Sequence, residues 1–263
     1  TVTALPFTFD ALARAYADPG AERPKPPAYA RYIAWLQNRD TPAALAHWRS
    51  ELAGFDAPSL LPGDRTARDA AEPDGHGERL VAFDAAESRA LTDLARRRHL
   101  TLNTLFQAAW ALVLARTGDK DDVAFGVTVS GRDIDLAGVE ETIGLFINTV
   151  PLRLDARQGT LGDWLAHVQG VHQENSRHAF VPLAEIQEVA DTGPGVALFD
   201  SLLVFENYPM ESALTGANAD EAVRFVEGAA IDRTNYALTL VVAQAEARLR
   251  LRVGYATCRP SAA

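Results

Sequence analysis

The sequence contains one cysteine, Cys258, and no run of 18 apolar residues. A single cysteine excludes an internal disulfide framework, and we expect no zinc-type spacing of ligands in this sequence. Together with the lack of a signal-like segment, these absences predict a soluble protein of the cytoplasm. Positive charge is also scarce, because 25 Lys and Arg residues stand against 35 Asp and Glu residues, and residues 96–98 form the one basic cluster. A nucleic-acid-binding protein is therefore not expected.

What the sequence does contain is typical of a globular protein. Hydrophobic residues make up 48% of the 263 residues, and charged residues make up 23%. This length and composition suffice for one large hydrophobic core or two modest ones.

Two common catalytic patterns are missing. The glycine-bearing runs at residues 192–195 and 216–218 lack the spacing of a phosphate-binding loop and are typical of turns. Ser130 follows a predicted strand, but no G-x-S-x-G turn surrounds it and the order of Asp and His residues supports no catalytic triad. A hydrolase is therefore not expected.

The histidines are scattered along the chain. His167 and His172 are five residues apart, a spacing that suits neither the i, i+4 metal-ligand arrangement nor a pair of partners. We interpret each histidine as a surface or core residue and predict no metal site. The six histidines are His47, His76, His99, His167, His172 and His178.

Local patterns predict alternating helices and strands. Asp84 followed by Glu87 is a capping box, and Thr101 can cap a helix that ends at Gly118. We expect the buried stripe of that helix to consist of Leu102, Leu105, Phe106, Ala109, Leu112 and Val113.

The expected elements make an α/β layer fold with helices packed on a mixed sheet. Residues 123–129 are almost continuously apolar, as in a strand covered on both faces. Residues 24–27 form a proline-rich linker, and residues 67–77 form an exposed polar loop. The aromatic residues of the helix at residues 29–36 are expected to be core residues. The predicted helices are 9–16, 29–36, 41–54, 84–99, 101–118 and 160–177, and the predicted strands are 79–83, 123–129, 150–154, 198–205, 223–228, 238–243 and 249–254.

The segment at residues 140–155 reads EETIGLFINTVPLRLD. From Val150 to Leu154, apolar residues alternate with period two, which predicts a half-buried strand. Gly144, Asn148 and Thr149 indicate a special backbone just before that strand.

The passage IGLFINTVPLR in this segment resembles the (I/V)GxFxNTxxxR motif of condensation domains of nonribosomal peptide synthetases. YARYIAWL is similar to the family motif YxDYAxW, and LAHWRSELAG with LPGDR is similar to LxYWxxxLAG and LPxDR. Residues 178–186, HAFVPLAEI, resemble the HQxxPLxxI region. VSGRD, LFDSLLVFENYP and NYALTL also resemble family passages. The matches follow the family order over nearly the whole chain, which argues against chance.

The resemblance implies a fold like half of chloramphenicol acetyltransferase. Condensation domains have two such lobes facing across a tunnel, and residues 1–263 resemble the C-terminal lobe. The HHxxxDG motif, whose second histidine is tied to catalysis, does not occur in these residues. Either the chain is a truncated piece of such a domain or the motif is degenerate in the parent protein. We expect a lobe that is truncated at both ends and inactive by itself.

The resemblance also implies two supporting site residues. Arg132 matches the arginine that pairs with the aspartate of HHxxxDG, and in a lone lobe we expect water to solvate it. Asn207 matches a tunnel-facing asparagine, although a turn residue before Pro209 explains it equally well.

The remaining polar residues of the central motif, Asn148 and Thr149, are expected to be structural. An apolar patch around Phe146 and residues 204–208 is expected where the missing lobe would lie.

The activity implied is formation of an amide bond between an upstream acyl or peptidyl thioester and a downstream aminoacyl thioester. Both substrates arrive on 4′-phosphopantetheine arms, so the lobe is expected to bind no cofactor or metal directly. The expected partners are the N-terminal lobe of the same domain, the upstream and downstream peptidyl carrier domains and the adjacent adenylation domain. Neither nucleic acid nor a membrane is expected as a partner.

Two alternatives stay open. One is a catalytically silent relative that recruits another enzyme, as X-domains do. The other is an epimerisation domain or a CoA-dependent acyltransferase. LFINTVPLR and VFENYP favour condensation over epimerisation.

Overall fold

The computed structural model describes residues 25–61, 76–157, 159–193, 195–206, 234–245 and 248–256, together with Tyr16 and Gly20. The chain divides into two compact units. The first comprises residues 1–40, 130–147 and 207–232, and the second comprises residues 41–129, 148–206 and 233–263.

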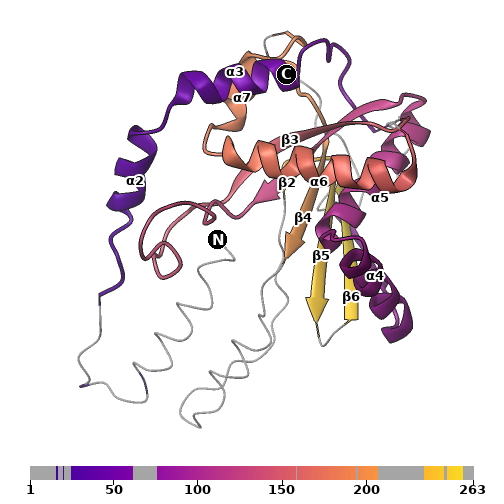
Figure 1. The fold of residues 1–263 in the computed structure, drawn as a ribbon, viewed down its shortest axis with the longest axis horizontal. Coiled ribbons are helices and arrows are strands. Elements are labelled where there is room, and N and C mark those ends of the chain that lie inside the picture. Colours follow the sequence, from indigo (N-terminus) through magenta and orange to yellow (C-terminus); the bar gives the residue numbers. More distant parts are fainter. Residues whose placement is uncertain are drawn as a thin grey trace. The chain divides into compact units, whose positions relative to one another are not determined.

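The second unit is built on a six-stranded mixed sheet in the order β1-β6-β5-β4-β2-β3 (Figure 1). Strand β4 runs parallel to both of its neighbours, β2 and β5, and the other neighbouring pairs are antiparallel. The predicted α/β fold with a mixed sheet is therefore confirmed. The strands are β1 (His76–Ala82), β2 (Asp122–Val129), β3 (Asn148–Asp155), β4 (Ser201–Glu206), β5 (Leu238–Ala245) and β6 (Arg248–Ala256).

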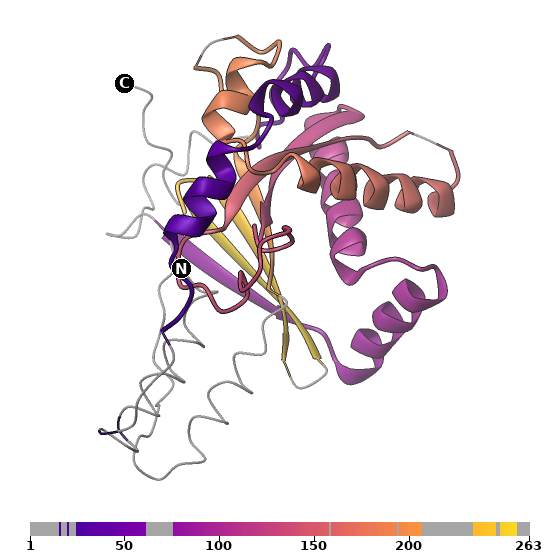
Figure 2. The ribbon, with the colours of Figure 1, turned by 60° about the vertical axis from the view of Figure 1, so that its left-hand side comes forward.

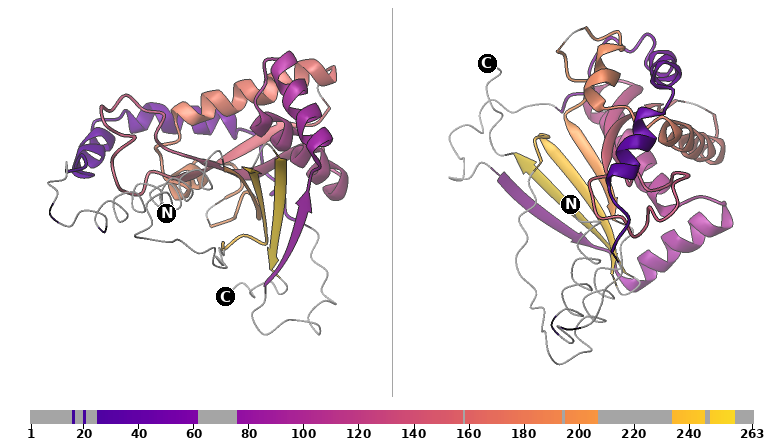
Figure 3. Two further views of the ribbon diagram at one scale, coloured as in Figure 1. Left: turned by 90° about the horizontal axis from the view of Figure 1, so that it is seen from below. Right: turned by 90° about the vertical axis from the view of Figure 1, so that its left-hand side faces the viewer.

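Three helices form a layer on one face of this sheet (Figure 2). Helix α4 (Ala85–Arg97) contacts β6, α5 (Leu102–Gly118) contacts β2, and α6 (Leu161–Arg177) contacts β3. Helix α5 lies between α4 and α6 and touches both. Two further helices, α3 (Thr41–Glu51) and α7 (Leu183–Glu188), pack side by side, and α7 contacts β3 (Figure 3).

The helices begin where capping side chains satisfy free backbone N–H groups. Asp84 accepts hydrogen bonds from the N–H groups of Ala86 and Glu87, and the Glu87 carboxylate accepts from the Asp84 N–H, which confirms the predicted capping box. The side chains of Thr101 and Thr160 likewise accept hydrogen bonds from backbone N–H groups in the first turns of α5 and α6. None of the described helices is long and apolar enough to cross a membrane.

The predicted buried stripe of α5 was wrong. Ala109 and Val113 are exposed, and the other predicted stripe residues are only partly buried. Helix α5 is apolar almost all round, so its periodicity does not single out one face. Small and polar side chains instead allow α5 to lie close to the sheet and to α6, where Thr104 hydrogen-bonds Gln169 and Gln107 hydrogen-bonds His172. The buried residues of α5 are Thr104, Gln107, Ala108, Ala111, Leu114 and Ala115.

Several predicted boundaries also differ from the structure. Strand β1 begins at His76, inside the predicted loop, and β4 begins at Ser201 rather than at residue 198. Phe199 instead forms an isolated parallel bridge with Ser59. Helix α3 ends at Glu51, three residues before Gly54. Apart from Tyr16, the predicted helix 9–16 lies outside the described residues, as does the strand 223–228.

The described part of the first unit consists of helix α2 (Ala30–Gln37) and the loop 130–147. A small apolar cluster joins them, built on the buried side chains of Tyr32, Val139 and Phe146. The predicted burial of the aromatic residues at 29–36 holds for Tyr32, whereas Tyr29 and Trp35 are only partly buried against this cluster. Ile33 is 40% exposed.

Candidate functional site

The loop between β2 and β3 turns inwards at Gly131. This residue has a φ of +66°, and a Cβ atom there would lie 1.9 Å from the carbonyl oxygen of Phe146. Only glycine fits such a backbone at such a close approach. Gly131 therefore directs the next side chain, Arg132, into the loop.

The Arg132 side chain lies inside this loop and is only 7% exposed. Its Nη1 donates to the carbonyl oxygen of Val139, and its Nη2 donates to that of Thr142 at 3.1 Å. The guanidinium carbon lies 4.3 Å from the centroid of the Phe146 ring, a cation–π contact. The arginine thus ties three separate points of the loop together.

The expectation that water solvates Arg132 was therefore wrong. The loop supplies its own neutral carbonyl acceptors, which satisfy part of the guanidinium without solvent. Among the described residues no carboxylate pairs with Arg132, and its Nε has no hydrogen-bond partner. Pairing of Arg132 with an aspartate of a second lobe stays a prediction.

Tyr29 holds the same loop from α2. Its hydroxyl donates to the carbonyl oxygen of Leu145, and its ring meets Phe146 edge-on at 5.4 Å. A Cβ atom at Gly144 would lie 2.0 Å from the Tyr29 ring, so glycine is required there for contact rather than for a positive φ. Two of the sequence motifs thus pack directly on one another.

The prediction of an exposed apolar patch around Phe146 was wrong for Phe146 itself. Phe146 is 2% exposed, because Tyr29, Tyr32 and Arg132 cover its ring. Its neighbours Ile143 and Leu145 are the exposed apolar residues of the loop, at 43% and 58%.

Asn148 opens β3 and has a structural role, as predicted. Its Nδ2 donates to the carbonyl oxygens of Ala179 and Val181, both at 2.8 Å, and its Oδ1 accepts from the Thr149 N–H. These bonds connect the start of β3 to the segment that follows α6. The side chain is fully occupied by backbone groups and is not available to a substrate.

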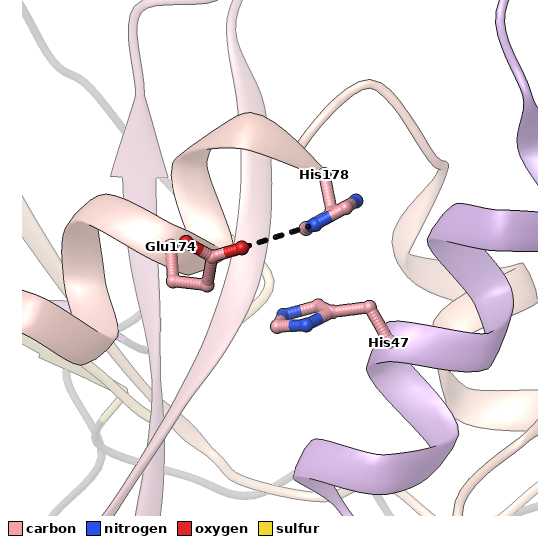
Figure 4. Close-up of side chains that lie close together, drawn as sticks. All are labelled: His47, Glu174 and His178. Atoms are coloured by element: carbon pink, nitrogen blue, oxygen red, sulfur yellow. Dashed lines mark ion pairs between the residues drawn. The ribbon is translucent and has the colours of Figure 1, made fainter.

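A third cluster consists of two histidines and a glutamate (Figure 4). His47 comes from α3, Glu174 from the last turn of α6, and His178 from the cap position of α6. The two imidazole rings stack with centroids 4.2 Å apart, and His178 Nε2 lies 3.5 Å from Glu174 Oε1. Burial and then the neighbouring His47 imidazole lower the pKa of His178 below its ordinary value, against the opposing effect of Glu174.

The sequence model of the condensation domain family matches residues 7–259 of this chain. The chain belongs to the condensation domain family. Over 221 residues it is 43% identical to chondramide synthase cmdD of Chondromyces crocatus, a match that spans 82% of this chain and 5% of that synthase. It is 33% identical over 223 residues to bacitracin synthase 3 of Bacillus licheniformis, a match that spans 84% of this chain and 3% of that protein.

Solved structures of the family have the same fold, which is that of chloramphenicol acetyltransferase. The condensation domain from the monacolin K polyketide synthase MokA superposes with a TM-score of 0.73 at 20% identity, covering 97% of this chain and 61% of that one. The X-domain from teicoplanin biosynthesis superposes with a TM-score of 0.72 at 23% identity and the same coverage. The present chain therefore spans about three fifths of each solved domain.

The structure describes one of the two predicted site residues, Arg132, but not the other, Asn207. Arg132 has a defined place in the loop between β2 and β3. Asn207 lies outside the described residues, directly after the end of β4 at Glu206, and its role in a tunnel stays a prediction. Ser130 accepts a hydrogen bond from the Arg132 N–H, and in the described part of the chain no histidine contacts it.

The histidine cluster was missed by the sequence analysis. Glu174 and His178 do stand at the i, i+4 spacing of one helix face, which could have been noticed. His47 lies on another helix, and no local pattern connects it to α6. The interpretation of each histidine as a surface or core residue did not foresee that His47 and His178 stack on one another.

Proposed function

We propose that this chain is the C-terminal lobe of a condensation domain in a nonribosomal peptide synthetase. The observation that carries this proposal is the family match over residues 7–259. The identity of 43% to a chondramide synthase supports a place in such an assembly. The similarity of fold by itself does not separate condensation from recruitment, because the TM-scores to a condensation domain and to an X-domain are 0.73 and 0.72.

The complete domain would join two carrier-bound substrates. The amine of a downstream aminoacyl thioester attacks the carbonyl carbon of an upstream acyl or peptidyl thioester. The C–N bond forms through a tetrahedral oxyanion, the C–S bond breaks, and the proton lost by the amine leaves with the pantetheine thiol. Catalysis then requires positioning of two tethered reactants and stabilisation of the oxyanion.

This lobe would contribute one wall of the site. Arg132 keeps the loop between β2 and β3 in shape, and its Nε–H, which has no acceptor among the described residues, would donate to the carboxylate of the HHxxxDG motif of the other lobe. The partners would be that N-terminal lobe, the two peptidyl carrier domains and an adjacent adenylation domain. Both substrates would arrive on 4′-phosphopantetheine, and the lobe would bind no cofactor of its own for this reaction.

The test compares the 263-residue chain with the same chain joined to an HHxxxDG-bearing N-terminal lobe. Two carrier domains loaded with an acyl and an aminoacyl group are mixed with each protein, and mass spectrometry follows the condensed product on the downstream carrier. We expect product from the two-lobe protein and none from the chain alone. Product from the chain alone would overturn the requirement for a second lobe. A two-lobe protein that binds both loaded carriers without forming product would favour the silent recruitment function.

A further inference from the structure

The cluster of His47, Glu174 and His178 lies in the second unit, between α3 and the C-terminal end of α6 (Figure 4). Each residue offers one ligand atom, and all of these atoms lie within 4.8 Å of one another. All three side chains are half-buried, so solvent and ions reach them while the helices hold them in place.

A buried asparagine orients the first of these ligands. His47 Nε2 lies 2.9 Å from Asn175 Oδ1, and Asn175 Nδ2 points to the Pro151 carbonyl oxygen at 3.5 Å. Because that carbonyl can only accept, the amide oxygen faces His47 and keeps the proton on Nε2. The lone pair of His47 is then on Nδ1. Hydrogen bonds of this kind fix the orientation of metal-binding histidines.

The second histidine lies against the first and beside the carboxylate. Its ring stacks on that of His47 with centroids 4.2 Å apart, and its Nε2 lies 3.5 Å from Glu174 Oε1. A histidine binds a metal ion through the lone pair of a ring nitrogen. Glu174 adds a carboxylate to the two imidazoles.

We propose that His47, Glu174 and His178 bind a divalent transition-metal ion of the zinc class. Two imidazoles and a carboxylate are a known ligand set for Zn²⁺, with a fourth position open to water. Ligand atoms about 2.1 Å from a tetrahedral ion lie about 3.4 Å apart. The two imidazole planes are stacked at 21° to one another, so one ring has to turn before the lone pairs of both can meet at the ion.

Such an ion would compete with one existing contact. Arg177, from the same helix, donates to Glu174 Oε2, but its side chain is 71% exposed. Exposed ion pairs of this kind are weak, so an ion can replace Arg177 or use the other carboxylate oxygen. The bound ion would connect α3 to the end of α6.

The site is separate from the proposed amide-forming function and does not rest on it. None of its ligands is Arg132 or Asn207. His47 stands in the passage LAHWRSELAG, at the place where the family motif LxYWxxxLAG has tyrosine. The family motif therefore does not account for a histidine at this position.

The test is a calorimetric titration of the chelator-treated 263-residue chain with Zn²⁺ at pH 7.5. We expect one ion per chain, and we expect His47→Gln, Glu174→Gln and His178→Gln each to weaken binding at least tenfold. His167→Gln on the exposed side of α6 is the matched control and should leave the affinity unchanged. Arg177→Ala should leave it unchanged or tighten it, because it frees the carboxylate.

Three results would overturn the site. The first is that the wild-type chain takes up no Zn²⁺, and the second is that the double variant His47→Gln/His178→Gln binds as well as wild type. A third measurement needs no variant and covers the case in which substitution prevents folding. In the NMR spectrum of the wild-type chain, substoichiometric Ni²⁺ should broaden the ring signals of His47 and His178 first. Earlier broadening of His167 would place the ion elsewhere.

Discussion

Residues 130–147 and the strands β2 and β3 on either side of them hold their shapes by different means. The strands pair over eight residues, from Asp122 with Asp155 to Val129 with Asn148, and bury Phe125, Val150 and Leu152. The loop has no ladder, and short backbone turns together with the side chains of Arg132 and Tyr29 bind its carbonyl groups instead. Backbone groups are thus paired regularly in the strands, and by local turns and a few polar side chains in the loop. The strands should therefore respond mainly to loss of apolar volume, and the loop to loss of single contacts.

The largest effect is expected from Leu152→Ala in β3. This side chain is fully buried, so the substitution should lower the free energy of unfolding by about 3 kcal/mol through lost burial and a residual cavity. Urea unfolding followed by circular dichroism measures the loss. Ile143→Ala, at an exposed position of the loop, is the control and should change stability by less than about 0.5 kcal/mol. If both substitutions lowered the free energy of unfolding equally, the proposed difference between the strands and the loop in their response to lost apolar volume would be wrong.

The next effect is expected from Gly131→Ala in the loop. Alanine would have to adopt a positive φ, and its Cβ would collide with the Phe146 carbonyl oxygen. We expect a loss of about 2 kcal/mol or more, measured by native-state hydrogen exchange of the loop amides. Gly54→Ala separates the two causes, because Gly54 has a φ of +72° with nothing within 4 Å. It should cost only about 1 kcal/mol.

Arg132→Ala should have a smaller effect that is confined to the loop. It leaves the Thr142 carbonyl group without the Nη2 donor, leaves the Val139 carbonyl group with only the Thr142 N–H, and removes the contact with Phe146, at a cost of about 1 to 2 kcal/mol. Hydrogen exchange should rise at residues 130–147 and not in β2 or β3. Arg96→Ala, which removes an exposed pair with Asp93, is the control. A loss in the two-lobe protein well above that in this chain would support the predicted aspartate partner.

The smallest expected effect is a pH dependence of the free energy of unfolding that arises from His172 on α6, outside the loop. Burial lowers the pKa of His172 on α6 below its ordinary value of 6.5. As pH falls through 6.5, the unfolded chain takes up a proton that folded His172 does not, so stability should fall between about pH 6.5 and 5 and stay level above about pH 7. The loop contains no histidine and should lack this dependence. His172→Gln should reduce the slope, and His167→Gln should not. Unfolding curves at pH 7.5 and 5.5 decide the matter.

Local structure was predictable where local chemistry determines it. The Asp84 capping box, the Thr101 cap and the apolar run of β2 all have the structure that their patterns predict. The buried side of α5 was not predictable, because large apolar residues surround the helix and most of its buried residues are small or polar.

Contacts between distant residues were the other limit. Arg132 could be matched to a family position, but no pattern indicates that the carbonyl groups of its own loop surround it. His47 and His178 come together only because α3 and α6 pack in the same unit. Such pairings depend on tertiary structure, and one sequence without its fold does not specify them.

The order of strands in the sheet has a consequence for how the protein is made. β2 and β3 are separated only by their loop, so they can pair soon after both leave the ribosome. Among the described strands β1 pairs with β6 alone, so His76 must wait until Ala256 has been synthesised before its partner exists. During that interval β1, with Leu80 and Val81, has no partner strand in this sheet, and other nascent chains can pair with it. Aggregation of this sheet during translation should therefore begin at β1, which is made first of its six strands and is paired last.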